Sequence, residues 1–323
     1  MRFASTIAIV AVTVAAVSCN SRQSSSDSTE AVAVSATRPF RQVSVPGIYG
    51  GQDGLNYFTE HYWDNFFKDA ESYSSDSLMV AGVTNEEFEQ AFANYVYALE
   101  RLPLDKACEC VSSLYSDMAL LRDNDGAEAF DGILGIAERY LYDPNSPVRN
   151  EDLWNPIAAA LASDPKTPQD KLPSYEFQAR VSSLNRVGSK AADFRFIDKN
   201  GRIRTLYSIK ADHVLLFFSN PGCNACKDII ENLRSSLKVD YLLESEKLAV
   251  VNVYIDEDIK AWREYMPYYP EEWYNGYDPD FVIRTDLLYN VRAIPSLYLL
   301  DKDKTVIMKD ATEEKVFNYI DNL

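Results

Sequence analysis

Residues 214–226 read VLLFFSNPGCNAC, and this stretch decides the fold of the second half of the chain. Residues 214–218 form a continuous apolar run, which predicts a short strand buried on both faces of a sheet. The motif Cys223-Asn224-Ala225-Cys226 follows directly. The next apolar residues recur at helical spacing, at Ile229, Ile230, Leu233 and Leu237. The two cysteines therefore stand where a buried strand passes into a helix.

The cysteine pair has the position and spacing that disulfide exchange requires. Unpaired N–H groups in the first turn of a helix favour a thiolate, so we expect the pKa of Cys223 to fall from about 8.5 into a range of roughly 3.5–7.5. Cys226 comes one helical turn later and can attack a mixed disulfide formed on Cys223. Cys223 is thus the candidate nucleophile and Cys226 the resolving thiol. An inert stabilising disulfide and half of a CxxC zinc site are the alternatives.

The patterns on either side of this motif predict an α/β domain over residues 187–323. Residues 193–197 alternate between apolar and polar, and Asn200-Gly201 predicts a two-residue hairpin turn before a second strand at 203–207. The remaining expected elements are a strand at 248–255, a helix at 258–266, strands at 296–300 and 305–309, and a C-terminal helix. The order is a hairpin, a βαβ unit and a ββα unit.

Residues 187–323 resemble the thioredoxin-fold thiol–disulfide oxidoreductases of the TlpA/ResA kind. The resemblance rests on the hairpin that begins at residues 188–194, the two cysteines at the strand-to-helix junction, the β–α insert at 248–266 and the segment Ala293-Ile294-Pro295-Ser296. It implies a central mixed sheet flanked by helices. It also implies that Pro295 is cis and stacks against the cysteine pair, and that the backbone of Ile294 pairs with an extended substrate segment. A trans bond before Pro295 is the alternative.

The resemblance further implies an acidic residue that accepts the proton of the resolving thiol. The nearest matches are Asp256 and Glu257, of which Glu257 is preferred. Alternatively, residues 256–258 only cap the helix that follows. Pro221 and Gly222 are candidate substrate-binding residues beside the nucleophile, and Gly222 departs from the Trp that many relatives carry. Lys304 replaces the usual glycine of the last hairpin, which predicts a different turn.

The first half of the chain predicts an all-α domain over residues 47–186. About six helices are expected, without strands, at residues 55–66, 84–99, 104–122, 127–142, 151–163 and 174–185. Thr84-Asn85-Glu86-Glu87 matches a capping box. Residues 55–65 resemble an uncharacterised helical domain that is fused to such modules in lipoproteins of Gram-negative anaerobes.

Several other residues have a packing interpretation beside a functional one. Cys108 and Cys110 would point about 200° apart on a helix, so we expect Cys110 to pack inward, with a disulfide or a zinc site as alternatives. His61 is expected to pack in an aromatic helix. The aromatic residues between 262 and 277 predict packing of the insert onto the sheet, with a peptide-binding groove as the alternative.

The N-terminus predicts export and lipidation. Residues 1–18 have the form of a secretory signal, and Ala16-Val17-Ser18-Cys19 resembles the lipobox of bacterial lipoproteins. This resemblance implies cleavage before Cys19 and acylation of its thiol; a plain signal peptide is the alternative. Residues 19–46 are rich in serine and predict a flexible tether. We therefore expect a lipid-anchored protein in the cell envelope of a Gram-negative bacterium, facing the periplasm or the surface.

The composition argues against two further classes of function. The 32 Lys and Arg against 49 Asp and Glu give a net charge of −17, which argues against nucleic acid as a partner. Two histidines argue against a multi-histidine metal centre, and no cofactor is expected beyond the cysteine pair.

The predicted function is a membrane-tethered thiol–disulfide oxidoreductase that acts on cysteine-containing proteins. The resembled family is mostly reducing and is recharged by another thiol carrier, which favours a reductase. A binding or scaffold lipoprotein with a structural thioredoxin-like module is the alternative. Thiol peroxidase chemistry is disfavoured because Asn220 stands where a Thr or Ser is usual.

Overall fold

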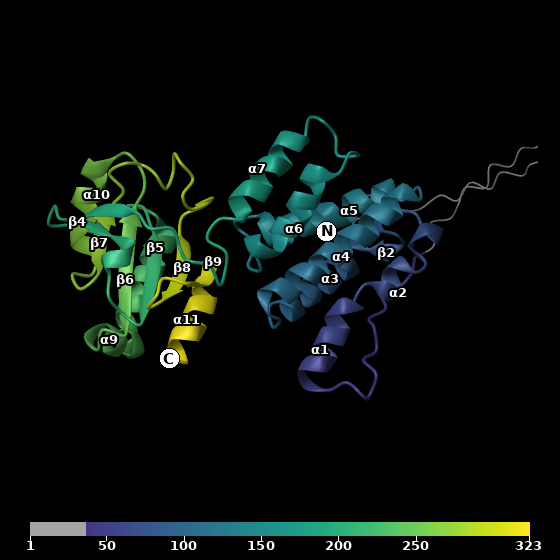
Figure 1. Ribbon diagram of the computed structural model, residues 1–323, viewed down its shortest axis with the longest axis horizontal. Helices are drawn as coiled ribbons and strands as arrows, with labels where there is room; N and C mark the ends of the chain where they lie inside the picture. Colours follow the sequence, from purple (N-terminus) through teal and green to yellow (C-terminus); the bar gives the residue numbers. More distant parts are fainter. Residues whose placement is uncertain (1–36) are drawn as a thin grey trace, which may run out of the picture. The chain divides into compact units, whose positions relative to one another are not determined.

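The computed structural model describes residues 37–323. The expected signal peptide, Cys19 and the first part of the tether lie outside the described residues. Among the described residues, no helix combines the length and the apolar character needed to cross a bilayer. A mainly helical half is followed by an α/β half with a mixed sheet, which is the order of fold classes that the sequence predicts (Figure 1).

The N-terminal half is built from helices. They are α1 (Gly51–Glu60), α2 (Asp64–Phe67), α3 (Asn85–Leu99), α4 (Leu104–Asp123), α5 (Ala127–Ala137), α6 (Glu151–Ser163) and α7 (Leu172–Ser182). The helical pattern expected to end at residue 142 leaves the α-helical form at Glu138–Tyr142, which is a π-helical turn. The short strands β1 (Met79–Val80) and β2 (Val83–Thr84) contradict the expectation that this half lacks strands. Ala81 and Gly82 close this hairpin with φ values of 45° and 78°, which is the left-handed geometry of a two-residue turn.

Aromatic side chains dominate the core of the helical half. Phe40, which belongs to the expected tether, lies against Trp63 with a distance of 5.4 Å between the ring centroids. Thr84 caps α3 by accepting a hydrogen bond from the N–H of Glu87 at 3.4 Å. The Glu87 carboxylate accepts from the N–H of Phe40 at 3.0 Å instead of reaching back, so only half of the expected capping box forms. His61 is 40% exposed beside Asp64.

The C-terminal half contains a seven-stranded sheet in the order β4-β3-β7-β6-β5-β8-β9. The strands are β3 (Arg195–Asp198), β4 (Ile203–Thr205), β5 (His213–Phe218), β6 (Leu248–Tyr254), β7 (Tyr274–Tyr277), β8 (Ser296–Asp301) and β9 (Val306–Ala311). Strands β5, β6 and β7 run parallel to one another, and the other pairs are antiparallel. Alternate residues of β5 contribute to two cores, one on each face of the sheet.

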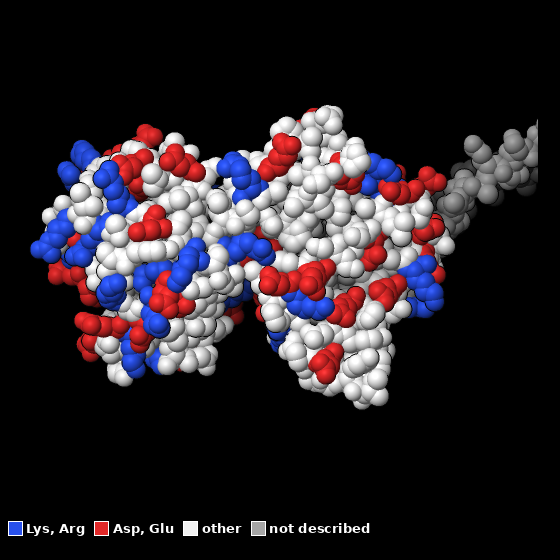
Figure 2. Space-filling view, in the orientation of Figure 1, with Lys and Arg blue, Asp and Glu red and all other residues white. Residues whose placement is uncertain are grey.

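Four helices contribute to the core on one face of this sheet. They are α8 (Asn224–Ser235), α9 (Leu237–Glu244), α10 (Ile259–Tyr265) and α11 (Glu313–Asp321). Side chains from the segments around Phe194, Leu206 and Tyr289 pack on the other face. In Figure 1, α9 and α11 lie beside the strands of the sheet. On the face shown in Figure 2, acidic and basic side chains are interspersed.

Four local expectations for this half are wrong. The first hairpin has a three-residue turn, because Asp198 still pairs with Arg202 and Gly201 takes a φ of 76°. Its second strand ends at Thr205, and Leu206–Ser208 form a 3-10 turn. Leu237 is 84% exposed, because the chain turns at Ser236 and begins a new helix there. Strand β7 was not expected.

The aromatic insert and the last hairpin show two further outcomes. Trp262, Tyr269 and Trp273 are buried, which confirms packing of the insert, although Tyr268 is 63% exposed. Lys304 adopts a φ of 64° in the last hairpin, so it takes the left-handed backbone that a glycine would supply. The turn therefore keeps a left-handed residue despite the substitution.

Candidate active site

The two cysteines of the CNAC motif lie at the start of α8. Cys223 is the N-cap residue, and its Sγ accepts a hydrogen bond from the N–H of Cys226 at 3.1 Å. A disulfide joins the two residues, whose Cα atoms are 5.2 Å apart. Cys223 is half-buried, whereas Cys226 is only 1% exposed. Only the sulfur of Cys223 is thus open to attack from outside.

The Ile294–Pro295 segment lies beside Cys223. The Ile294–Pro295 peptide bond is cis, as the resemblance implies. The carbonyl oxygen of Ile294 lies 4.0 Å from the Sγ of Cys223. This approach follows from sheet register, because Ser296 opens β8 opposite Phe218, the last residue of β5. Two motifs that are about seventy residues apart in sequence therefore form one site.

The turn before Cys223 explains the absence of the usual tryptophan. Gly222 is exposed with a φ of 76°, and nothing lies within 4 Å of where its Cβ would be. A bulky residue fits the space but not the left-handed backbone, which glycine adopts at little cost. Pro221 is half-buried beside it, and the N–H of Cys223 donates to the carbonyl of Asn220 at 3.3 Å.

The three acidic residues after β6 have different surroundings. The carboxylate of Asp256 accepts a hydrogen bond from the side-chain amide of Asn220 and forms an ion pair with Arg284. Glu257 is exposed, with no side-chain hydrogen bond or ion pair to residues 37–323. Asp258 caps α10 by accepting from the N–H of Ala261 at 2.9 Å. Asp256 is therefore the acid that contacts the cysteine-bearing loop.

A buried polar network supports the loop from below. The Oγ of Ser219 donates to the side-chain oxygen of Asn252, whose amide nitrogen donates to Asn275 at 3.1 Å. Asn275 in turn donates to the carbonyl of Pro270 at 2.7 Å, and the hydroxyl of Tyr269 lies 3.4 Å from Ser219. Burial raises the pKa of Tyr269. The network ties the end of β5 to β6, β7 and the aromatic insert.

This network was not predicted from the sequence, although the sequence contains one signal of it. Asn252 interrupts the apolar run of residues 248–255. A polar side chain within a buried strand is nearly always hydrogen-bonded, so its partners could have been sought.

The two cysteines of the helical half are free thiols. Cys110 packs inward from α4, as expected, while Cys108 is half-buried. Burial raises the pKa of both thiols. Among residues 37–323, no group of three or more His, Cys, Asp or Glu side chains is placed to hold a metal ion.

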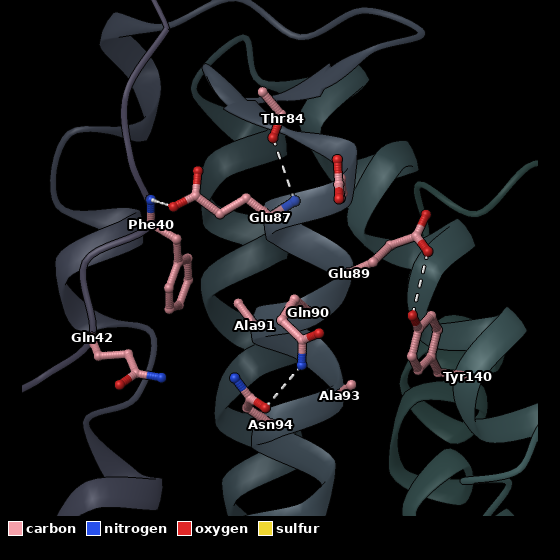
Figure 3. Close-up of a pocket in the computed structure, with 11 residues that line it drawn as sticks. Phe40, Gln42, Thr84, Glu87, Glu89, Gln90, Ala91, Ala93, Asn94 and Tyr140 are labelled. Carbon is pink, nitrogen blue, oxygen red and sulfur yellow. Dashed lines mark hydrogen bonds between the residues drawn. The ribbon is translucent and has the colours of Figure 1, made fainter.

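The helical half contains an open cavity of about 730 Å³ beside α3. Figure 3 shows two of its glutamates, Glu87 and Glu89, turned toward protein partners. Glu87 accepts from the N–H of Phe40, and Glu89 accepts from the hydroxyl of Tyr140 at 3.3 Å. Its lining contains no cysteine, so it offers no group for thiol chemistry.

Two family models match the chain. A domain of unknown function, DUF5106, matches residues 18–182, and a thioredoxin-like model matches residues 211–306. No functionally curated protein matches the chain.

Solved structures from Bacteroides are similar to the chain. A thioredoxin-like protein from Bacteroides caccae ATCC 43185 is 34% identical, with 89% of this chain and 99% of that one covered at a TM-score of 0.74. The C-terminal domain of an uncharacterized protein from Bacteroides fragilis NCTC 9343 is 44% identical over 42% of this chain and 98% of its own, with a TM-score of 0.41. The thioredoxin domain of a thiol-disulfide oxidoreductase from Bacteroides vulgatus is 19% identical over 42% and 96%, with a TM-score of 0.37.

The extent of two of these matches shows the family of the chain. The Bacteroides caccae structure is matched over nearly its whole length, and the model of the domain of unknown function covers half of this chain. The chain therefore belongs to the DUF5106 family, and its C-terminal half contains a thioredoxin-like domain.

Proposed function

We propose that this protein is a thiol–disulfide oxidoreductase that exchanges disulfides with cysteine-containing proteins. The observation that carries the proposal is the asymmetry of the cysteine pair. Cys223 caps α8, is half-buried and faces the carbonyl of Ile294, whereas Cys226 is buried behind it. An inert structural disulfide has no need of one accessible sulfur beside an open backbone segment.

The exchange proceeds in two displacements. In the reduced protein, the thiolate of Cys223 attacks one sulfur of a substrate disulfide; a bond forms between Cys223 and the substrate, and the other substrate sulfur leaves as a thiolate. The thiolate of Cys226 then attacks the Sγ of Cys223 and forms the Cys223–Cys226 disulfide. The second substrate sulfur leaves as a thiolate, and both released thiolates take up protons. Two electrons have passed from the cysteine pair to the substrate.

The proposed direction is reduction of the substrate, which follows the resemblance to the TlpA/ResA kind. A dithiol carrier protein closes the cycle by attacking the Cys223–Cys226 disulfide, becoming oxidised itself and leaving the pair reduced. We also propose a lipid anchor at Cys19, which would hold both reactions in the cell envelope on the tether predicted over residues 19–46.

The residues around the pair support binding of an extended substrate segment. Ile294 is half-buried and its carbonyl oxygen lies 4.0 Å from the Sγ of Cys223, while Gly222, directly before Cys223, is exposed and carries no side chain. Asp256 is the proposed acceptor for the proton of Cys226, because its carboxylate contacts the loop that carries Cys223, whereas Glu257 points to solvent.

The test is trapping of mixed disulfides by the Cys226→Ala variant of the full chain. We expect Cys223 in this variant to retain a substrate as a covalent adduct, which a reducing agent releases. The control is the double variant Cys223→Ala with Cys226→Ala, which keeps Cys108 and Cys110 and therefore reports their background reactivity.

A second measurement decides against the scaffold alternative. The reduced wild-type protein should reduce a model peptide disulfide, and alkylation should show a pKa for Cys223 below the usual value of about 8.5. An empty trap together with an ordinary pKa and no exchange would leave the scaffold function in its place.

A further inference from the structure

A group of buried charged side chains joins the helical half to strands β8 and β9. We call it the buried ion cluster, and its members are Arg149, Glu151, Asp152, Arg292, Lys309 and Asp310. The side chains of Glu151 and Lys309 are 1% and 3% exposed. The cluster balances three acidic groups against three basic ones.

One arm of the cluster reaches the segment that precedes Pro295. The carboxylate of Glu151, at the start of α6, lies 2.6 Å from the Nε of Arg292 and also accepts a hydrogen bond from the side chain of Asn290. The guanidinium of Arg292 lies over the ring of Tyr142, 4.4 Å from its centroid. Arg292 is two residues before Ile294, whose carbonyl faces Cys223. Two residues of the helical half therefore hold this segment.

A second arm reaches the residue that follows Pro295. The Oγ of Ser296 donates to one oxygen of Asp310 at 2.7 Å, and the other oxygen accepts from Arg149 at 3.2 Å. Ser296 is fully buried. The Ile294–Pro295 bond is thus anchored on both sides by charges that the helical half supplies or completes.

Stability alone is a weak explanation for such a cluster. Removing charges from water is costly, and well-packed apolar residues often serve as well or better at a buried site. Hydrogen bonds to charged groups, such as those from Asn290 to Glu151 and from Ser296 to Asp310, are directional, whereas apolar packing is not. This difference matters where a backbone segment must meet a substrate.

We propose that the helical half acts on the redox site by positioning the Ile294–Pro295 loop, and that Glu151 is the positioning residue. The proposal rests on the function proposed above, because the loop is held in the conformation that pairs with an extended disulfide-containing segment of a protein substrate. Glu151 itself touches neither the cysteines nor the substrate and acts through Arg292.

Asp152 provides a matched control within the same cluster. Its carboxylate accepts from the N–H of Val187 at 2.9 Å and lies 3.5 Å from Lys309, so it joins the two halves without touching residues 290–296. A variant at Asp152 therefore perturbs the cluster but leaves the loop contacts in place.

The experiment compares Glu151→Gln with Asp152→Asn in the full chain, using a peptide disulfide and a small aromatic disulfide as oxidants. Loss of a contact that couples a distant residue to a binding site changes the affinity of that site by roughly two- to thirtyfold. We therefore expect KM to rise by this factor for Glu151→Gln with the peptide disulfide, but not for Asp152→Asn and not with the small disulfide. The small disulfide does not need the backbone of Ile294, so its rate should stay unchanged. Equal effects of both variants, or equal effects on both substrates, would overturn the proposal.

Amide hydrogen exchange over residues 288–297 separates this proposal from the proposed function. Faster exchange in Glu151→Gln than in Asp152→Asn shows that Glu151 holds the loop, even if the wild type reduces neither substrate and the proposed function fails. Unchanged exchange refutes the positioning role. If Glu151→Gln does not fold, Arg292→Gln removes the same contact from the loop side, with the same expected split between the two substrates.

Discussion

Replacement of Lys309 by methionine tests the buried ion cluster most directly. The ammonium group of Lys309 lies 3.2 Å from Glu151 and 3.5 Å from Asp152, and it donates to the carbonyls of Ser182 and Leu184 at 2.7 Å. Methionine keeps most of the apolar stem and removes the charge. Two buried carboxylates and two carbonyls then lose a partner.

The expected loss is large at neutral pH. Breaking a buried ion pair from one side costs about 3–5 kcal/mol of the free energy of unfolding, since the remaining charge stays buried without compensation. Lys315→Met is the control, because Lys315 also pairs with the helical half, through Glu100, but is 35% exposed. Exposed pairs contribute about 0–1 kcal/mol.

The loss should also depend on pH. Burial already raises the pKa of Glu151 in the folded protein, while Lys309 and Arg292 act in the opposite direction. Without Lys309 the folded pKa rises further above the unfolded value of about 4.3. The folded state then binds more protons than the unfolded state, so stability falls as the pH rises through that window and recovers as the pH is lowered. The penalty of Lys309→Met should therefore be smaller at pH 5 than at pH 7.

Urea unfolding followed by tryptophan fluorescence measures both effects, because each half contains two buried tryptophans: Trp63 and Trp154 in one, Trp262 and Trp273 in the other. Midpoints for the wild type, Lys309→Met and Lys315→Met at the two pH values give the differences in unfolding free energy. A loss below about 1 kcal/mol for Lys309→Met, or a loss that is the same at both pH values, would show that Lys309 does not compensate the buried charge of Glu151.

Three further predictions concern the redox site. In the reduced protein, iodoacetamide should label Cys223 at least about tenfold faster than the buried Cys226, as followed by peptide mass spectrometry; equal rates would contradict the asymmetry. Asn252→Leu should cost about 1–3 kcal/mol in urea unfolding, because Asn275 and its neighbours lose buried partners; a neutral effect would show that the network is dispensable. Gly222→Val should lower stability by roughly 1 kcal/mol or more through its left-handed backbone, whereas Gly222→Asn should lose less.

Elements whose pattern lies within their own residues were predicted from the sequence. Strands β5 and β6 are apolar except at His213 and Asn252, and α8 repeats its buried residues at helical spacing. Strand β7 has no such pattern: it reads Tyr-Asn-Gly-Tyr, and it exists because it pairs with β6 and β3. Gly276 is required there, since the ring of Phe196 occupies the space of a side chain.

Leu237 shows how local spacing misleads. Its apolar side chain continues the repeat of α8, but Ser236 takes an extended conformation and caps the next helix. The repeat was therefore counted across a break in the backbone, which hydrophobic spacing does not reveal.

The candidate site also has one part that was predictable from the sequence and one part that was not. The CNAC motif and the Ile294–Pro295 segment are short motifs, so each was recognisable, and their approach follows from the pairing of β5 with β8. The contacts of Glu151 with residues 290–292 span about 140 residues of chain. Nothing in the residues around Glu151 indicates which loop it meets, so that connection required the folded structure.

The unequal exposure of Cys223 and Cys226 limits how many reaction partners can bind at the disulfide at one time. In the proposed reaction, the dithiol carrier and the disulfide substrate must both react at the sulfur of Cys223, because Cys226 is only 1% exposed. The carrier and the substrate cannot be bound at the same time, so each must dissociate before the other binds. Steady-state rates should then follow a ping-pong pattern, and an excess of either the carrier or the substrate should inhibit the reaction.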